Sequence, residues 1–550
     1  MTFRPLAAAL VAAVGLVLPL AVTSGAVQAE TSSEPPTEMS VIVALTVPAT
    51  SSGILDSETL EDYTGEFGLL TRELDAVIDR PVTIGIDPMI VASIRLLGSS
   101  APESAVQWLD RLALASNDTF PLSWADADVT AALQAGSPTV LAPLSLDFAI
   151  DSSRFGDAAE QPTSTPTPGS DPTTDPVDPG SPPPLPTTES LLEWDYTLPA
   201  LVWPRMDTVV ATDLPVLAAS YDGAIVSSSN LATKAEGALA TAGDLEMVVA
   251  DTTLSGLLSA AVETTTVEDW ETAIAALDAA VTAAAGSSTS IVLTLDRGVS
   301  LADSDLGPTL DRILGNPSIT PVGLSAFDGD EAPATTLVDL PQDAERVATV
   351  ARLLADEQAE ATFLQIAADP ALLTAQRRIA LLSVLSSSIA DDDVAWPASA
   401  LAFEERSASI RSAVQIVRSS AITLWADRGS LPVVVENNLS QAVTVYIRVR
   451  PSLPLLRVED DFVELTIEPN SQRKAQIPVQ SISNGDVDLQ ISLHKSNDAA
   501  IGDTTHVRTT VQAGWETPVT IVAAVLVGLV FIAGIIRTVL KRRRLREEAE

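Results

Sequence analysis

The chain has 550 residues, of which 46% are hydrophobic, and its formal net charge is −42. It therefore has enough apolar material for a large core and for more than one domain. A surface this acidic favours solubility and repels nucleic-acid phosphates, which argues against DNA or RNA as a partner. The sequence contains no cysteine, so no disulfide can stabilise any part of it.

An export signal is predicted at the start of the chain. Arg4 precedes an uncharged run that continues to Gln28, and the small residues of Val27-Gln28-Ala29 suit cleavage after Ala29. Residues 1–29 are therefore predicted to be a signal peptide. An uncleaved N-terminal anchor is the alternative.

Short β-like runs alternate with helix-length stretches between residues 38 and 425. The helical stretches, such as 62–77, 104–114 and 267–284, have apolar residues that recur at intervals of three and four. The strand candidates are 40–47, 81–86, 119–124, 139–144, 200–204, 215–220, 245–250, 290–295 and 319–324. Continuously apolar strands between helices indicate a parallel sheet that is covered on both faces. The fold class is therefore predicted to be α/β, with a closed or nearly closed (β/α) barrel-like domain at 38–425. A doubly wound open sheet is the alternative.

One segment of this region differs in composition. Residues 158–190 are rich in Pro, Thr, Ser and Asp and nearly free of large apolar residues, so they cannot contribute to a core. We expect a disordered insertion within the barrel-like domain, because the same alternating pattern continues on both sides. Three helical patterns, at 343–357, 371–388 and 402–419, follow the last strand and are predicted to pack on the flank of the barrel.

The hydrophobic period changes at Leu431. Residues 428–512 contain short alternating strands separated by Asn, Pro and Gly turns, which predicts an antiparallel, immunoglobulin-like β-sandwich that acts as a spacer. The uncharged run from Thr517 to Ile536 is long enough to cross a hydrocarbon core of about 30 Å. A transmembrane helix is therefore predicted at 517–540, with a buried helix as the alternative.

Basic residues follow this run and set its orientation. They are Arg537, Lys541, Arg542, Arg543, Arg544 and Arg546. Basic residues beside a span stay on the cytoplasmic side of the membrane. Residues 541–550 are thus predicted to be a cytoplasmic tail, and the chain is predicted to be a single-pass protein of the cell membrane with its bulk outside.

Acidic and aromatic residues follow several predicted strands. The carboxyl ends of the strands form the mouth of a (β/α) barrel, where active sites of this fold lie. The candidates for catalysis at these positions are Asp87, Asp126, Asp128, Asp251 and Asp296. The candidates for ligand binding are Trp124, Trp203, Asp222 and Arg297. Because sugar rings stack on aromatic faces beside carboxylates, this mouth is predicted to bind a glycan, with cleavage of the glycan as the alternative.

A structural role competes with the catalytic one. Asp is a favoured helix N-cap, and Asp87-Pro88 has the layout of a helix start. We predict that Asp126 caps a helix that begins near Ala127, and that Asp128 lies in its first turn. A glycosidase would need two carboxyl groups about 5 to 9 Å apart, one of them with a raised pKa.

Several site classes have no candidate residues. The histidines, His494 and His506, both fall in the predicted sandwich, so the barrel-like domain has no imidazole for a zinc site or a catalytic triad. The sequence also has no EF-hand spacing and no phosphate-binding Gly-rich loop. No metal and no cofactor are therefore predicted.

Several segments together resemble a known family. They are VTIGIDPMIV at 82–91, LSWADADVTAAL at 122–133, LVWPRMDTVVATDLPVLAAS at 201–220, LTLDRG at 293–298 and LPVVVENNLSQAVTVYIRV at 431–449. With the terminal span, they resemble the actinobacterial family called domain of unknown function 6049. The resemblance implies an exported, C-terminally anchored protein, often encoded beside the lipid II flippase of peptidoglycan synthesis, and it implies no established activity. The barrel is more distantly similar to glycoside hydrolase and deacetylase barrels, although the missing histidines depart from the deacetylase pattern.

These observations predict a membrane-anchored, extracytoplasmic protein of the cell envelope. Its barrel mouth is predicted to bind cell-wall glycan or a membrane protein of the wall-synthesis machinery. A carboxylate-dependent glycosidase acting on envelope polysaccharide is the first alternative. The second is a non-catalytic scaffold for a membrane partner, which is favoured if side chains fill the mouth.

Overall fold

The computed structural model describes residues 36–155, 185–235, 237–295, 297, 306–418, 420–425, 428–460, 462–512 and 516–547. The predicted signal peptide, residues 158–184 of the predicted insertion and Asp296 lie outside the described residues. All helices and strands described below belong to the unit Thr37–Glu550.

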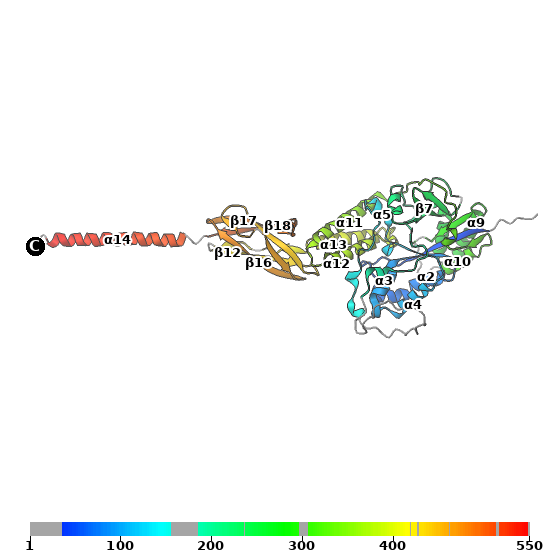
Figure 1. The fold of residues 1–550 in the computed structure, drawn as a ribbon, viewed down its shortest axis with the longest axis horizontal. Helices are drawn as coiled ribbons and strands as arrows, with labels where there is room; N and C mark the ends of the chain where they lie inside the picture. Colours follow the sequence, from blue (N-terminus) through cyan, green and yellow to red (C-terminus); the bar gives the residue numbers. More distant parts are fainter. Residues whose placement is uncertain are drawn as a thin grey trace, which may run out of the picture. The chain divides into compact units, whose positions relative to one another are not determined.

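A first sheet is built around β1 (Thr37–Leu45) (Figure 1). β2 (Thr83–Ile86) and β8 (Ser290–Thr294) run parallel to it, β3 (Thr119–Pro121) runs parallel to β2, and β9 (Ile319–Pro321) pairs with the first residues of β1. Every residue of β2 and β8 is buried, as are all but one of β1. The uninterrupted apolar runs of the sequence thus form strands that are covered on both faces.

A second sheet has the order β4-β5-β7-β6. β4 (Leu201–Val202), β5 (Gly223–Ser227) and β7 (Leu245–Ala250) are parallel, and β6 (Leu239–Ala242) is antiparallel to β7. Gly243 joins β6 to β7 at a φ of +61°, a backbone conformation that glycine adopts without steric cost.

Side chains from both sheets share one core. Between the sheets, the Leu198 amide donates to the Thr119 carbonyl at 2.9 Å and the Asp251 amide donates to the Val292 carbonyl at 2.8 Å. The shared cluster contains Ile42, Phe120, Leu201, Ile225, Val248 and Val292, among others. The chain is therefore an α/β protein with parallel sheets, as the sequence predicts.

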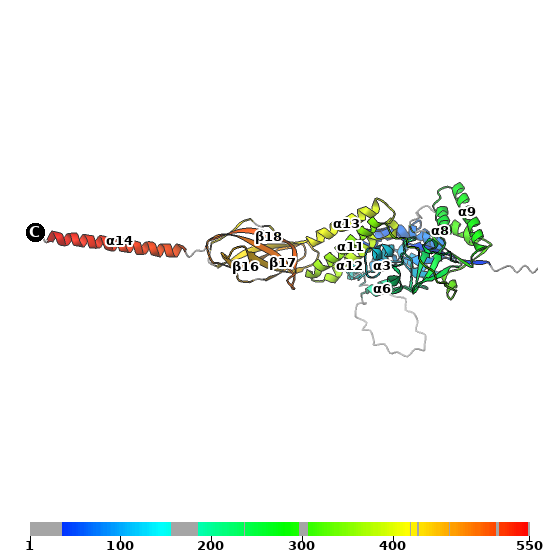
Figure 2. The ribbon, with the colours of Figure 1, turned by 90° about the horizontal axis from the view of Figure 1, so that it is seen from above.

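Helices connect and cover these strands (Figure 1). They are α1 (Ser57–Thr64), α2 (Leu69–Val77), α3 (Pro88–Leu97), α4 (Glu103–Ala113), α5 (Val129–Gln134), α6 (Thr188–Leu192), α7 (Leu214–Ala218), α8 (Thr252–Val262), α9 (Val267–Ala285), α10 (Leu306–Leu314), α11 (Ala344–Phe363), α12 (Pro370–Val384) and α13 (Ala395–Arg411). The last three lie side by side (Figure 2). They contribute Leu353, Leu382 and Phe403 to the same core cluster as β1.

Several local predictions are wrong; the predicted helix 402–419, for example, ends at Arg411, and its last part contains the strand Val414–Ile416. The predicted helix 62–77 is two helices, because a Cβ at Gly68 would lie 2.2 Å from the Tyr63 carbonyl oxygen and the chain turns there. The predicted strand 215–220 is largely α7, which has Asp213 at its N-cap position and a proline in its first turn. The predicted strand 139–144 forms neither helix nor strand.

Two further sheets surround a second core in residues 414–511, here called the C-terminal β region. One is antiparallel and comprises β10 (Val414–Ile416), β12 (Arg428–Asn437), β16 (Ser471–Ser481) and β14 (Leu456–Val458). The other comprises β11 (Ile422–Leu424), β18 (Ala500–Val511), β17 (Gly485–His494), β13 (Val443–Pro451) and β15 (Val463–Ile467). Only β11 and β18 are parallel within it. Along β13 buried and half-buried residues alternate, so the predicted period of two is confirmed.

The last helix, α14 (Glu516–Glu547), is long and apolar. Its segment Val519–Arg542 has a mean hydropathy of 3.0, and none of this segment is buried. Among the described residues it is the one helix long and apolar enough to cross a membrane. It is a candidate single membrane span that could anchor the chain.

The core between the two parallel sheets gives a stability prediction. Phe120 is fully buried there, so we expect Phe120→Ala to lower the free energy of unfolding by about 3–5 kcal/mol through lost burial and a cavity. Denaturant unfolding of the full chain in detergent measures it. Phe67→Ala is the matched control, because Phe67 is 79% exposed and its truncation should change stability by less than about 0.5 kcal/mol. Equal effects would contradict a shared core.

Candidate functional site

Four of the predicted site residues meet at the carboxyl ends of the parallel strands. Asp87 follows β2, Asp126 lies beyond β3, Trp203 directly follows β4, and Arg297 lies beyond β8. All of them are buried. The topology thus brings together side chains that are up to 210 positions apart in the sequence, from Asp87 to Arg297.

Arg297 is the centre of this cluster. Its Nη1 donates to Asp126 Oδ1 at 2.7 Å and to the Trp203 carbonyl at 2.9 Å, and its Nη2 donates to the Pro204 carbonyl at 2.9 Å. Its Cζ lies 4.6 Å from the Trp203 ring centroid, within range of a cation–π interaction. One guanidinium therefore links the ends of β3, β4 and β8.

The backbone at Asp126 is strained. Ala125 and Asp126 have φ values of +55° and +47°, a region that costs residues with a Cβ about 1 kcal/mol or more each. Hydrogen bonds hold this turn: the Ala125 amide donates to Asp87 Oδ1 at 3.0 Å, and the Ser387 hydroxyl donates to the Asp126 carbonyl at 2.9 Å. The turn directs the Asp126 carboxyl toward Arg297.

Burial changes the protonation of both acids. It raises the pKa of Asp126 to about 6, although the positive charge of Arg297 opposes the rise. Burial also raises the pKa of Asp87 well above its usual range, and the charge of Asp126 adds to the effect. Asp87 Oδ2 and Asp126 Oδ2 are buried without a hydrogen-bond partner among the described residues. These two carboxyls therefore hold protons more tightly than ordinary aspartates.

The helix cap in this segment is Asp128. Its Oδ1 accepts from the Ala131 amide at 3.0 Å and from the Thr130 hydroxyl at 2.9 Å, so α5 begins at Val129. The prediction that Asp126 caps this helix is wrong by two residues, because the left-handed turn at Ala125 and Asp126 precedes the helix start. The predicted cap at Asp87 is confirmed, since its Oδ1 accepts from the Met89 amide at 2.9 Å.

The other predicted site residues lie elsewhere. Asp251 caps α8 through the Thr253 and Leu254 amides, at 2.9 and 3.0 Å. Asp222 is exposed and precedes β5, so it lies at the amino end of its strand. Trp124, a predicted ligand-binding residue, is buried.

The indole of Trp124 lies in the core that contains β1. Its Nε1 donates to the Gly53 carbonyl at 3.1 Å. The apolar run before Trp124 therefore continues into the core, and this aromatic ring is closed to solvent. The predicted catalytic candidate Asp296 falls outside the described residues.

A polar cleft of about 570 Å³ adjoins the strand ends. The residues that line it, here called the Trp396 cleft, are Arg205, Gln342, Asp343, Glu345, Arg346, Thr349, Arg352, Ala390, Asp391, Asp392, Asp393, Trp396, Pro397, Ala400, Leu401 and Glu404. They come from α11 and the two residues before it, α13, the segment between α12 and α13, and the segment after β4. Six carboxylates and three guanidiniums line this cleft.

Arg346 connects the Trp396 cleft to Asp128. Its Nη2 lies 3.4 Å from Asp128 Oδ2, which also accepts from Gln342 Nε2 at 2.7 Å. The Cζ of Arg346 lies 4.5 Å from the Trp396 ring centroid. Arg346 Nε and Trp396 Nε1 are buried, and neither has an acceptor among the described residues. Both residues line the cleft, so its wall contains two buried hydrogen-bond donors without a partner in the described part of the chain.

Sequence reasoning missed this cleft. Residues 343–357 are predicted only as a flanking helix, and Trp396 is not among the predicted site residues. The sequence does contain a signal for this cleft: three consecutive aspartates precede Val394-Ala395-Trp396. Acidic residues beside an aromatic ring are the same pattern that predicts sugar binding at the strand ends. Only the fold shows that Arg205 and Arg346 join them.

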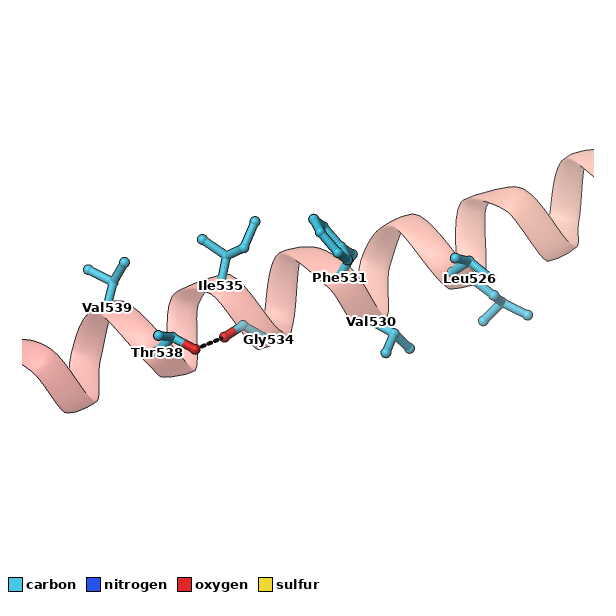
Figure 3. A pocket seen from close by; sticks show the side chains of 8 residues that line it. Leu526, Val530, Phe531, Gly534, Ile535, Thr538 and Val539 are labelled. Carbon is cyan, nitrogen blue, oxygen red and sulfur yellow. Dashed lines mark hydrogen bonds between the residues drawn. The ribbon is translucent and has the colours of Figure 1, made fainter.

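A second hollow lies on α14 (Figure 3). It is lined by Leu526, Val527, Val530, Phe531, Gly534, Ile535, Thr538 and Val539. The Thr538 hydroxyl donates to the Gly534 carbonyl of the same helix at 2.8 Å, so the lining offers no free polar side chain. It is an apolar helix face suited to lipid or to another helix. Among the described residues, no group of three or more His, Asp and Glu is placed to hold a metal ion.

The Arg297–Asp126 pair gives a pH-dependent prediction. We expect Arg297→Ala to cost about 3–5 kcal/mol at pH 8, because it leaves a buried carboxylate without its cation. The cost should be smaller at pH 5, below the Asp126 pKa of about 6, where this carboxyl is already mostly neutral. Denaturant unfolding at both pH values measures it.

In the unaltered chain, the contribution of Asp126 to stability changes with pH in the opposite direction to that of an ordinary ion-paired aspartate. The pKa of Asp126 is about 6 in the folded chain and about 3.9 in an unfolded one, so its contribution to stability falls as pH rises from about 4 through 6. Arg111→Ala is the control: its pair with Asp75 is exposed and should cost less than about 1 kcal/mol at either pH. An equal cost of Arg297→Ala at both pH values would contradict the assignment.

The two cap residues give a second prediction. Asp128→Ala should cost about 3–5 kcal/mol, because it removes a cap and leaves Arg346 and Gln342 without their buried acceptor. Asp251→Ala removes a cap that is only half buried and should cost about 1 kcal/mol. Thermal unfolding of the two variants compares them. If the two costs are the same, Asp128 is only a cap.

Comparison with curated proteins finds no match. Among solved structures, the alpha-amylase AmyC from Thermotoga maritima is 9% identical, with 68% of this chain and 93% of that chain covered and a TM-score of 0.41. Alpha-2-macroglobulin from Escherichia coli is 15% identical over 18% of this chain, with a TM-score of 0.16, and the match spans only 7% of the macroglobulin. SSP-19, an MSP-domain protein like family member of Caenorhabditis elegans, is 13% identical over 17% of this chain and 94% of its own, with a TM-score of 0.14. A model described as a family of unknown function, DUF6049, matches residues 3–547, so the chain belongs to that family.

Proposed function

We propose that this chain is a membrane-anchored, extracytoplasmic protein of the cell envelope that binds cell-wall glycan without cleaving it, in the Trp396 cleft. The exposed apolar helix α14 supports the anchoring. The basic residues that follow Ile536 support an orientation with the tail in the cytoplasm. The signal-peptide pattern at 1–29 supports export of the rest.

In this proposal the two parallel sheets are two arcs of one (β/α) barrel that begins near residue 38 and ends before the C-terminal β region, because β10 and β11 pair with the sheets of that region. The shared core and the backbone hydrogen bonds at both borders of the sheets support this arrangement. The C-terminal β region, which includes β10 and β11, would form an immunoglobulin-like sandwich between the barrel and the span at 517–540, with 541–550 in the cytoplasm. The alternation of burial along β13 and its neighbours supports the sandwich.

The observation that carries the proposed binding site is the pair of unused donors. Leaving a buried donor unsatisfied costs about 1–3 kcal/mol, so Arg346 Nε and Trp396 Nε1 favour a ligand that brings acceptors into the cleft. Sugar hydroxyls accept from these donors and also donate to carboxylates such as Asp391 and Glu404. The excess of carboxylates over guanidiniums in the lining disfavours a polyanion and favours an uncharged glycan.

The buried acids favour binding over cleavage. Asp87, Asp126 and Asp128 are each at most 2% exposed, whereas a glycosidase acid and base must reach the glycosidic bond from both sides. One observation favours the glycosidase alternative: the pKa of Asp126 is raised to about 6, which suits a general acid. This alternative requires Arg297 to leave Asp126 and open the mouth.

The scaffold alternative also has an observation in its favour. Arg297 and Trp203 occupy the centre of the strand ends, so side chains fill the mouth there. In that case a protein of the wall-synthesis machinery, rather than a glycan, would be the partner. We assign glycan binding to the Trp396 cleft because it lies beside this filled centre and remains open.

The test is binding of peptidoglycan fragments and wall polysaccharides to the full chain in nanodiscs, followed by mass spectrometry of the ligand. We expect saturable binding and an intact ligand. Trp396→Phe keeps an aromatic ring but removes the unused donor, so it should weaken binding roughly 3- to 10-fold, the equivalent of one hydrogen bond. Trp270→Phe is the control, because the Trp270 Nε1 donates to Thr309 at 2.9 Å, remote from the cleft.

The other outcomes separate the alternatives. Cleaved products that disappear in Asp126→Asn would overturn non-catalytic binding and establish a glycosidase. Binding that Trp396→Phe leaves unchanged would remove the ligand from this cleft. If neither binding nor cleavage of a glycan is observed, a protein partner remains as the ligand.

A further inference from the structure

Three large apolar side chains on connections of the C-terminal β region are at least half exposed. Trp425 is 71% exposed, Leu453 50% and Ile482 54%. Trp425 directly follows β11, Leu453 lies between β13 and β14, and Ile482 lies between β16 and β17. Exposed apolar residues of this size on separate connections have no role in the core that the two sheets enclose.

The strand register places all three at one end of this region. Leu424 is paired with Val511, and the Gln512 amide donates to the Leu424 carbonyl at 2.8 Å, so Trp425 lies where β18 ends. Gly485 is paired with Val511 from the other side, and Gly485 ends the connection that carries Ile482.

The loop that carries Leu453 is tied to the same connection. The Ile482 amide donates to the Leu455 carbonyl at 2.8 Å. A Cβ at Gly485 would lie 2.9 Å from the Leu455 side chain, so these two connections are in close contact. Trp425, Leu453 and Ile482 are called the apolar tip below.

The apolar tip is held close to the start of the candidate membrane span. Val511 ends β18 and Glu516 begins α14. An extended chain advances at most about 3.5 Å per residue, so this connection can reach no more than roughly 17 Å. The end of the C-terminal β region that carries the tip must therefore lie near the membrane surface.

The chemistry of the tip suits a bilayer interface. Tryptophan is favoured at the level of the lipid headgroups, where its apolar ring is buried and its N–H stays wet. Arg428 and Arg457 are exposed, and each is paired with Gln480 from a neighbouring strand on either side of β16. Gln480 precedes Ile482 by two residues. Guanidiniums beside an apolar tip can bind anionic headgroups. Acids are also present, since Glu459 lies 3.9 Å from Arg428 and Asp486 accepts from Thr510 at 2.7 Å.

We propose that Trp425, Leu453 and Ile482 insert into the interface of the phospholipid membrane that α14 spans, and so dock the C-terminal β region on the outer leaflet. The inference rests on the proposed membrane anchoring. In this inference the C-terminal β region is not a mobile spacer, because it makes a second, peripheral contact with the membrane. The occupant is the lipid surface, because the connection to α14 keeps that surface within reach of the tip.

The absence of cysteine from the chain makes the test direct, since a single introduced thiol carries a single label. Trp425→Cys, Leu453→Cys and Ile482→Cys are each labelled with a polarity-sensitive fluorophore. The full chain is reconstituted in vesicles of phosphatidylethanolamine and phosphatidylglycerol. We expect a blue-shifted emission at all three positions and quenching by spin-labelled lipid. Phe67→Cys is the control, because Phe67 is exposed but lies in the loop between α1 and α2, and its label should stay aqueous.

A fifth position separates failure of this inference from failure of the anchoring. Phe531→Cys lies within α14, and its label must report hydrocarbon if α14 spans the membrane. If that label is lipidic while the three tip labels stay aqueous, the docking inference is wrong and the anchoring stands. If the label at position 531 is aqueous, both are wrong. Tip labels that are blue-shifted but insensitive to spin-labelled lipid would show that a protein surface, such as a second copy, covers the tip.

Discussion

The arrangement of the strand ends depends on the buried ion pair of Arg297 and Asp126. Removing both charges from water costs several kcal/mol per ion, and the structure offsets this cost with two backbone carbonyls and the Trp203 ring. The Asp126 carboxyl reaches Arg297 only because Ala125 and Asp126 adopt left-handed conformations. The result is a filled centre at the strand ends, where an open active site would need empty space.

A second buried pair, Asp128 and Arg346, connects the strand ends to the Trp396 cleft at the surface. Asp126 and Asp128 lie close enough for the charge of Asp128 to raise the pKa of Asp126. Asp128 in turn accepts from Gln342 and Arg346, and both of these residues line the Trp396 cleft. A ligand that contacts Arg346 therefore acts on a side chain that also holds the start of α5. Binding of a ligand in the cleft would thus be coupled to the stability of the strand ends through this one guanidinium.

The sequence predicts those parts of the fold that follow from local periodicity. β1, β2 and β8 are recognisable because each is a short, mainly apolar run without charged residues beyond Glu38, and α4 and α9 because their apolar residues recur at helical spacing. β5 is not predicted, although its apolar run of three residues is as long as that of β8; the apolar residues of 215–219, just before it, are predicted to be the strand instead. The candidate site is harder to predict, since a left-handed turn at Ala125 and Asp126 has no glycine to mark it. Trp203 and Arg297 are singled out as ligand contacts, yet in the structure they contact each other.

The composition of the chain limits what the Trp396 cleft can bind. The net charge of −42 and the six carboxylates of the lining repel a polyanionic wall polymer at the surface and in the cleft alike. At physiological ionic strength charges are screened beyond about 8 Å, so the lining has more influence than the distant surface. Arg205 is paired with Asp391 and Arg352 with Glu404, which leaves little free positive charge for phosphate or uronate groups. An uncharged sugar, which offers hydroxyls to both partners of each pair, satisfies these constraints without disrupting the pairs.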